Sequence, residues 1–477
     1  MRPLVWFRSD LRTADQPALE AACRRADRGV VAVFVCCPEQ WREHDWGDAK
    51  AGFVLRCAAE LSASLRALNV PLLFRVTPRF EGVPELLAAE AARWGCDGLF
   101  FNRELEVNER RRDEAVTRRF ESQGLPVYAF DDQTALAPGE VMTKEGGWYT
   151  VFTPFKKRWL AVLEERGLPA PCTPRRMPAP ACASDEPLAS APGFAPWAGA
   201  ELWPAGEAEA QRRLKAFVGP RLYDYRRDRD LPGVEGTSAI SPYLSAGAVS
   251  VRDCLRAAMK ANAGLAQGGS EGAATWISEL VWREFYRHLM VAFPRLSMGR
   301  PFRPETRRVP WRTDPEGLEA WKRGRTGYPF VDAGMRQLMR TGWMHNRLRM
   351  VTAMFLTKDL LIDWREGERH FMRLLVDADL AQNNGGWQWS ASTGTDAQPY
   401  FRIFNPVTQG ERFDPRGDYI RRWVPELAQR SDAQVHWPHG EGGLFGAGYP
   451  APIVDHALAR GRVLEAFGQA KGPSTNE

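Results

Sequence analysis

Residues 341–404 have the sequence TGWMHNRLRMVTAMFLTKDLLIDWREGERHFMRLLVDADLAQNNGGWQWSASTGTDAQPYFRIF. It is too polar for an ordinary core and too aromatic for an ordinary surface, since two carboxylates, an amide and two indoles follow residue 376 closely. Indoles pack on rings, and carboxylates and amides bond ring edges, so the set suits a large, flat, polar ligand. A helix cap at Asp379 or Asn383 followed by core tryptophans is the structural alternative. The combination favours a ligand site.

The start of this stretch has the spacing of a helix, which we expect over Trp343–Leu356. Trp343, Asn346, Arg347 and Met350 fall at i, i+3, i+4 and i+7, so in a helix they share one face. That face carries an indole, an amide, a guanidinium and a thioether, while apolar residues on the remaining surface can serve the core. The pattern predicts a helix with one side turned toward a ligand.

The length and composition describe an ordinary globular protein. At 477 residues the chain is too long for one core, which indicates two or more domains. The longest apolar runs, such as Val30–Cys37, are far shorter than a membrane span, and the chain starts directly with a strand-like run, so we expect no signal peptide. Eight scattered cysteines without a CxxC pair predict reduced thiols, a cytoplasmic protein and no metal site. The net charge of +5 permits nucleic-acid binding without requiring it.

Residues 1–131 alternate short apolar runs with helical patterns, and no GxGxxG fingerprint is present. Continuous apolar strands between helices predict an α/β domain with a doubly wound parallel sheet, in which ligands gather beyond the carboxyl ends of the strands. The expected strands are Leu4–Phe7, Val30–Val35, Leu72–Val76, Gly98–Phe101 and Val127–Phe130. The expected helices are Lys50–Leu68, Val83–Trp94 and Asn108–Ser122.

The periodicity breaks down after residue 131, and proline is frequent between Pro169 and Pro204. We interpret residues 132–205 as a long interdomain linker with one helix at Thr153–Arg166. Residues 206–470 read as helix almost throughout and predict an all-helical domain, including a helix over Ala273–Phe293. Residues 471–477 are expected to be a disordered tail.

The motifs GWMHNRLRM, DWREGERHFM, DADLAQNNGGWQW and FRIFNP, with VWFRSDLR at residues 5–12 and PIVDH at 452–456, make the chain resemble the photolyase and cryptochrome flavoproteins. The resemblance is nearest to the class I enzymes that repair cyclobutane pyrimidine dimers in UV-damaged DNA. It implies a light-driven carbon–carbon lyase in which non-covalent, reduced FAD transfers an electron to a dimer flipped out of the duplex. The helical domain would then be the FAD-binding catalytic domain.

The resemblance also implies which residues contact FAD. Phosphate and sugar contacts fall on a loop before a helix, where Ser241 would be the cap and Pro242 the first helical residue. Ala239-Ile240 departs from the family, whose members carry a larger polar residue and Leu there, so only backbone contacts are expected at position 239. Asn383 would meet the flavin N5, and Asp377, Asp379 and Arg349 would order the flavin ring edge and nearby phosphate charge. The implied FAD contacts are Tyr225, Thr237, Ser238, Ala239, Ile240, Ser241, Trp276, Arg283, Trp343, Asn346, Arg349, Asp377, Ala378, Asp379 and Asn383.

A second implied set would receive the lesion and carry electrons. Glu279, Trp282, Asn346, Met350 and Trp389 would form the lesion pocket, with Glu279 bonding a thymine edge. Arg229 and Arg347 would clamp the DNA backbone. Trp311, Trp364 and Trp387 match the family's electron-transfer chain, although three of 18 tryptophans can equally be core. Glu279 and Arg283, four residues apart, can also be a plain helical pair.

The third implied set binds an antenna chromophore. Val107-Asn108-Glu109-Arg110 matches the VNER motif, and with His44 it implies a site for 5,10-methenyltetrahydrofolate. In the structural alternative, Asn108 is a helix cap, Glu109 interacts with the positive end of the helix dipole, and His44 is a surface loop residue. A deazaflavin, or no antenna, is the alternative found among relatives.

Two other functions stay open. A blue-light signalling cryptochrome would share most motifs, but Asn383, Trp282, Met350 and the lack of a long C-terminal extension favour repair. A (6–4) photoproduct photolyase generally has a second His where Asn346 follows His345, which counts against that activity. We expect a monomer without an obligate protein partner.

Overall fold

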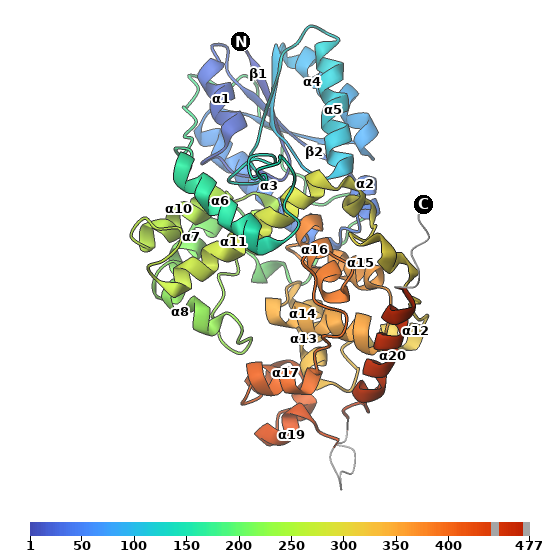
Figure 1. Ribbon diagram of the computed structural model, residues 1–477. Coiled ribbons are helices and arrows are strands. Elements are labelled where there is room, and N and C mark those ends of the chain that lie inside the picture. Colours follow the sequence, from blue (N-terminus) through green and yellow to red (C-terminus); the bar gives the residue numbers. More distant parts are fainter. Residues whose placement is uncertain (440–447, 471–477) are drawn as a thin grey trace. The chain divides into compact units, whose positions relative to one another are not determined.

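The computed structural model describes residues 1–439 and 448–470, so the tail expected at 471–477 lies outside the described residues (Figure 1). The chain divides into two compact units. Unit 1 comprises residues 1–226, 238–294 and 376–379, and unit 2 comprises 227–237, 295–375 and 380–477. Unit 1 therefore contains the sheet together with several helices from the region after residue 206. The domain boundaries expected after residues 131 and 205 remain a prediction from the sequence.

The core of unit 1 is a five-stranded parallel sheet with strand order β3-β2-β1-β4-β5. The first and fourth strands are buried at every residue, because helices cover both faces. Figure 1 shows α1 (Pro17–Arg25) on one side of the sheet and α4 (Val83–Trp94) with α5 (Val107–Glu121) on the other. The α/β doubly wound fold is confirmed. The strands are β1 (Pro3–Phe7), β2 (Val31–Cys36), β3 (Leu72–Val76), β4 (Gly98–Asn102) and β5 (Val127–Phe130).

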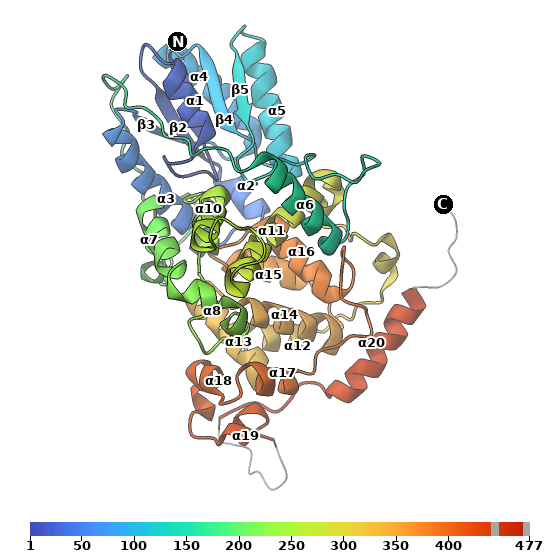
Figure 2. The same ribbon diagram turned by 60° about the vertical axis from the view of Figure 1, so that its left-hand side comes forward.

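The expected strands are confirmed to within a residue or two. Short continuous apolar runs bounded by turn residues are typical of buried strands, so both ends of each strand can be located from the sequence. The expected helices agree similarly. The remaining helices of unit 1, several of which are seen clearly in Figure 2, are α2 (Pro38–Glu43), α3 (Asp48–Ala67), α6 (Phe152–Arg166), α7 (Glu207–Phe217), α8 (Pro220–Asp228, ending in unit 2), α9 (Ser241–Ala246), α10 (Val251–Ala261) and α11 (Glu271–Ala292).

All regular elements among the described residues of unit 2 are helices. Helix α13 packs on α14 and α17, and α15 packs on α16. The helices are α12 (Pro315–Lys322), α13 (Pro329–Thr341), α14 (Asn346–Met354), α15 (Trp364–Leu374), α16 (Leu380–Ala391), α17 (Pro406–Phe413), α18 (Asp418–Trp423), α19 (Asp432–His436) and α20 (His456–Ala470), with a π-helical turn at Phe355–Asp359.

The helix expected over Trp343–Leu356 is wrong at its start. Gly342, with φ of 63°, closes α13, and His345 is extended and caps α14 by accepting the Arg347 N–H at Nδ1 (3.1 Å). Trp343 therefore lies outside the helix and does not share a face with Asn346 and Arg347. Periodicity alone missed this, because Trp343 happens to keep the helical spacing although Gly342 ends one helix and His345 caps the next.

The cap expected at Ser241 and the alternative of a cap at Asn108 are also wrong. Ile240, not Ser241, is the N-cap of α9, and Glu106, not Asn108, is the N-cap of α5. Ser241 and Asn108 are the first and second residues of their helices. Each helix thus begins at or one residue before the polar side chain that suggested the cap, which is the usual uncertainty of a boundary inferred from sequence.

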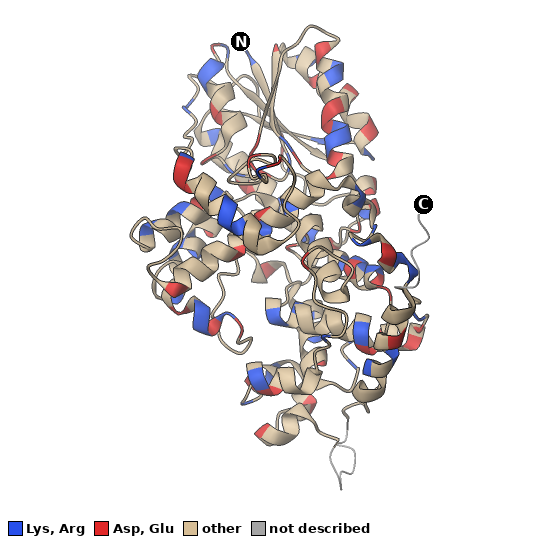
Figure 3. Cartoon of the chain, in the orientation of Figure 1, with Lys and Arg blue, Asp and Glu red and all other residues tan. Residues whose placement is uncertain are grey.

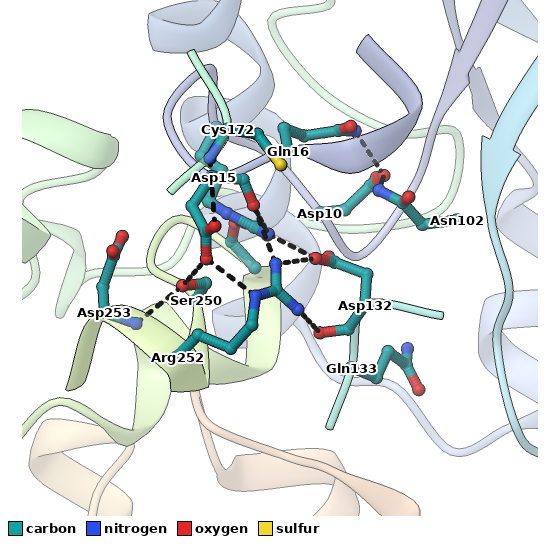
Figure 4. A network of polar contacts seen from close by, with 12 residues as sticks. Asp10, Asp15, Gln16, Asn102, Asp132, Gln133, Cys172, Ser250, Arg252 and Asp253 are labelled. Atoms are coloured by element: carbon teal, nitrogen blue, oxygen red, sulfur yellow. Dashed lines mark hydrogen bonds and ion pairs between the residues drawn. The ribbon is translucent and has the colours of Figure 1, made fainter. Parts of the chain in front are cut away.

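A buried ionic network joins the sheet of unit 1 to α10 (Figure 4). Its members are Arg12, Asp15, Asp132, Ser250, Arg252 and Arg256. Arg252 donates to Asp15 (2.9 Å) and Asp132 (2.6 Å), and Arg12 donates to the same Asp132 oxygen (2.6 Å). Burial opposes ionisation of Asp132, but the two guanidinium groups outweigh it and lower its pKa. The paired charges hold α10 against the loops that follow β1 and β5.

Candidate functional site

The predicted antenna residues of unit 1 lie together. His44 follows α2, and its Nδ1 is 3.3 Å from a Glu109 carboxylate oxygen, while its Nε2 is 3.0 Å from the Asn108 amide nitrogen. Its ring meets Phe80 edge-on at 5.6 Å. Burial opposes a charged imidazole, but the bond to Glu109 and its charge outweigh burial and raise the pKa of His44. Two distant segments thus build one polar cluster, which a mere loop histidine would not require.

The loop before α9 in unit 1 has the geometry of a backbone cradle. Ala239 adopts φ of 48°, an unusual conformation for a non-glycine residue. Ser238 Oγ accepts from Trp276 Nε1 at 3.4 Å, and the buried Trp276 also packs on Phe217, whose ring in turn meets Tyr225. Ser238, Ala239 and Ser241 have short side chains and are half-buried, which suits approach by a phosphate or sugar.

Helix α11 places further predicted residues in unit 1. Trp282 stacks on Phe152 of α6, with ring centroids 3.6 Å apart and planes 9° from parallel. Arg283 donates to the backbone oxygen of Gln133 at 2.8 Å, and burial lowers its pKa to about 10. Glu279 is half-buried, and its charge acts on Lys156 of α6. One indole face of Trp282 is therefore already covered by Phe152.

The Asp377–Asp379 segment of unit 1 is held by residues that the sequence did not single out. The Asp379 carboxylate bonds Arg287 of α11. The backbone oxygen of Ala378 accepts from Lys50 of α3 and from Ser245 of α9, the latter at 3.1 Å. Asp377 and Asp379 are both buried. Lys50, Ser245 and Arg287 come from three helices remote in sequence, so no local pattern could have identified them.

In unit 2, Asn383 is oriented by α15. Its Nδ2 donates to the Glu368 backbone oxygen at 2.8 Å, which fixes the amide plane and turns Oδ1 to the opposite side. The neighbouring Asn384 donates to the Glu368 side chain (2.8 Å) and accepts from Gln388 (2.8 Å). An amide in this position can accept a hydrogen bond and has no proton to lose.

The remaining predicted residues of unit 2 lie around α14. Arg347 pairs with Asp230 at 2.8 Å and lies over the Phe413 ring, while Arg229 is 3.9 Å from the same carboxylate. Asn346 is exposed. The structure thus brings Arg229 and Arg347 together. The half-buried members of the predicted sets in this unit are Arg229, Thr237, Trp311, Trp343, Arg347, Arg349, Met350 and Trp389.

The three tryptophans of the predicted electron-transfer chain differ in exposure. Trp364 and Trp387 are fully buried, and Trp387 belongs to an aromatic cluster with Trp321 and Phe371. Trp311 is half-buried and meets Phe467 of α20 edge-on at 6.0 Å. Two buried indoles and a partly exposed one are compatible with a route toward the surface.

Family models match most of the chain: "DNA photolyase" covers residues 3–178, and "FAD binding domain of DNA photolyase" covers 276–469. The chain is 45% identical to the deoxyribodipyrimidine photo-lyase of Vibrio cholerae over 98% of its own length and 100% of that protein, and 45% identical to that of Escherichia coli over 98% of each. The chain belongs to the DNA photolyase family. It is an enzyme of the deoxyribodipyrimidine photo-lyase type and a flavoprotein of DNA repair.

Solved photolyase structures agree. The bacterial class III photolyase of Agrobacterium tumefaciens is 37% identical with a TM-score of 0.89, over 99% of this chain and 98% of that one. A Synechocystis cryptochrome is 26% identical with a TM-score of 0.86, over 98% and 99%. The archaeal photolyase of Sulfolobus tokodaii, solved with two FAD molecules, is 29% identical with a TM-score of 0.80, over 98% and 100%. Photolyases and a cryptochrome share this fold, so the fold alone does not decide the activity.

The donor set in each unit fits the FAD that the photolyase family binds. Unit 1 offers the backbone cradle at 238–241 and a buried carboxylate at Asp379, and unit 2 offers the oriented amide of Asn383. These are groups that bond phosphates and the polar edge of a flavin.

The features that bear on other site chemistries in residues 1–439 and 448–470 are metal-ligand clusters, cysteine pairing, membrane-spanning helices and charge distribution. No group of three or more His, Cys, Asp or Glu side chains there could hold a metal ion. All eight cysteines are free thiols. None of the helices described is long and apolar enough to cross a membrane. Lys and Arg alternate with Asp and Glu along both units instead of gathering on one of them (Figure 3).

Proposed function

We propose that this photolyase repairs cyclobutane pyrimidine dimers in UV-damaged DNA, using light-induced electron transfer. When bound, reduced FAD supplies the electron. The observation that carries the proposal is Asn383, buried in α16 with its amide nitrogen fixed on Glu368 O. An amide accepts from a reduced flavin at N5 and offers no titratable proton, which favours the reduced form needed for repair.

The proposed FAD contacts are those implied by the sequence, from Tyr225 to Asn383. Asp379 would accept a hydrogen bond from the ring edge. Because Asp379 also pairs with Arg287, Asp379→Ala would leave a buried cation without any partner. Asp379→Asn removes the negative charge but keeps an oxygen that can accept from Arg287, so it is the sharper test. We expect Asp379→Asn to release FAD, measured by flavin fluorescence after gel filtration. Full retention of FAD would remove Asp379 from the site.

The proposed lesion pocket comprises Glu279, Trp282, Asn346, Met350 and Trp389. Base–aromatic stacking contributes about 1–3 kcal/mol per base, and a thioether adapts to a non-planar lesion. Because Phe152 already covers one face of Trp282, its other face is the one that can receive a pyrimidine. Arg229 and Arg347 would meet DNA phosphates, which positions any DNA without selecting the lesion.

The decisive experiment is repair of an oligonucleotide carrying one defined lesion. We expect purified, reduced protein to split a cyclobutane thymine dimer back into two thymines under blue light and not in darkness. Preference for a (6–4) photoproduct, or absence of any light-dependent repair, would overturn the proposed specificity. Absence of repair would favour the signalling function of a cryptochrome.

A binding experiment tests the pocket. Trp282→Ala should weaken binding to dimer-containing DNA at least tenfold more than binding to undamaged DNA, measured by fluorescence anisotropy. Trp94→Ala, on α4 of the same unit, is the matched control and should change neither. Glu279→Ala should lower the quantum yield of repair with a smaller loss of binding. Equal weakening for damaged and undamaged DNA in Trp282→Ala would refute the pocket.

We also propose that the cluster of His44, Asn108 and Glu109 binds an antenna, with 5,10-methenyltetrahydrofolate as the ligand. Glu109→Ala should remove a near-ultraviolet folate band from the purified protein and leave repair at high light intensity intact. A deazaflavin absorption band would show that the folate assignment is wrong. So would a second equivalent of FAD, since the structure of the archaeal relative contains two FAD molecules. We further propose a cytoplasmic monomer.

A further inference from the structure

The segment Val376–Asp379 belongs to unit 1, although the residues on both sides of it belong to unit 2. Four residues cannot form a stable element by themselves, so their conformation depends on side chains that hold them. Those side chains are Lys50, Ser245 and Arg287.

The backbone of the segment is held at Ala378. Its oxygen accepts from the Lys50 ammonium and from Ser245 Oγ (3.1 Å). Lys50 is buried in α3, and its ammonium lies 4.0 Å from the centroid of the Trp46 ring. Burial is the largest effect on Lys50 and lowers its pKa, while the charges of Asp379 and Glu106 oppose that change. A buried ammonium on a carbonyl oxygen is a strong, directional contact.

The carboxylate of the segment is held by Arg287. This guanidinium is buried, bonds Asp379 and Gln133, and lies 3.8 Å from Glu106. Burial raises the pKa of Glu106 to about 7 despite Arg287. Arg287 is therefore fixed from three directions, and its position fixes that of the Asp379 carboxylate.

We propose that Lys50, Ser245 and Arg287 form an anchor that positions Asp377, Ala378 and Asp379 for FAD. The inference rests on the proposed contact of this segment with FAD and names residues that do not themselves need to touch the cofactor. Lys50 and Ser245 set the backbone, and Arg287 sets the carboxylate. Loss of either kind of support lets the segment move away from the geometry that the flavin edge requires, and tight recognition is sensitive to such displacement.

The test measures FAD affinity by titrating flavin-free protein and following flavin fluorescence. We expect Arg287→Met to raise the Kd at least tenfold, Arg287→Lys to recover part of that loss because it keeps the charge, and Lys50→Met to raise the Kd about threefold. Arg75→Lys, which alters the Arg75–Glu90 pair elsewhere in unit 1, is the matched control and should leave the Kd unchanged.

Hydrogen exchange of flavin-free protein supplies a second readout. Faster exchange of amides at 376–381 in Lys50→Met, with the sheet of unit 1 unchanged, supports the anchor and also covers the case in which Arg287→Met fails to fold. A folded Arg287→Met or Lys50→Met protein with parental FAD affinity and parental exchange at 376–381 would overturn it. Failure of the parent to bind FAD would instead refute the proposed function.

Discussion

The ionic network of unit 1 and the aromatic cluster of unit 2 (Trp321, Phe371 and Trp387) are both buried, but different forces stabilise them. In the ionic network, the carboxylates of Asp15 and Asp132 share the guanidinium groups of Arg12 and Arg252. In the aromatic cluster, ring centroids lie 5.0–6.0 Å apart, and Trp321 Nε1 donates to the Thr352 backbone oxygen at 3.0 Å. The first depends on charge balance and the second on shape.

The largest effect is expected in the ionic network. Arg252→Met should destabilise unit 1 by about 3–5 kcal/mol, because Asp15 and Asp132 would stay buried with one cation fewer. Urea unfolding followed by circular dichroism measures this. Arg323→Met, which breaks an exposed pair with Glu319, is the control and should cost less than about 1 kcal/mol. Equal losses in the two variants would show that charge balance does not govern the network.

Shape should govern the aromatic cluster. A Cβ at Gly367 would lie only 2.0 Å from Trp387 Cη2, so Gly367→Ala should destabilise unit 2 by about 1–3 kcal/mol through overpacking. Gly386 of α16 has no atom within 4 Å of such a Cβ, so Gly386→Ala should stabilise the helix by about 0.5–1 kcal/mol. Thermal unfolding measures both changes. If the two substitutions changed the free energy of unfolding in the same direction, the steric explanation would be contradicted.

Unit 2 also buries the ammonium group of Lys358, whose cost depends on pH. Lys358, in the π-helical turn, donates to Ser392 Oγ at 2.9 Å, and burial lowers its pKa from 10.5 to about 7. Between these values the unfolded chain binds more protons than the native one, so this residue makes stability rise with pH, by up to about 1.4 kcal/mol per pH unit.

Lys358→Met should therefore be more stable than the parent at pH 7 and lose that advantage progressively toward pH 10. Comparison of the two proteins in urea across this range isolates Lys358 from other groups that titrate there. A stability difference that does not change between pH 7 and 10 would be inconsistent with a buried, titrating lysine.

The smallest effect on stability is expected at the edge of unit 2. Trp311→Phe keeps an aromatic ring against Phe467 and should cost less than about 1 kcal/mol. If Trp311 ends the electron-transfer chain, the same change slows photoreduction of oxidised FAD severalfold and spares repair by enzyme already reduced. Transient absorption measures the first and a dimer repair assay the second. If photoreduction were unchanged, Trp311 would not belong to the electron-transfer chain and its role would be purely structural.

The sequence determined the sheet and most helices, because apolar periodicity and turn residues act over neighbouring positions. It missed the start of α14, where His345 caps the helix through its own side chain. It also identified His44, Asn108 and Glu109 through a motif, and the structure brings these three together. His44 and Asn108 lie 64 residues apart, so the family resemblance and not a local pattern placed them in one set.

Tertiary structure alone decided which partners the buried charged groups contact. Asp15 meets Arg252 across 237 residues, and Lys50 meets Ala378 across 328, so no local pattern could pair them. Such contacts arise only when packing removes both groups from water, because a charge is then stable only beside its partner. The sequence supplied the chemistry of this photolyase, and the fold selected the partners that hold that chemistry in place.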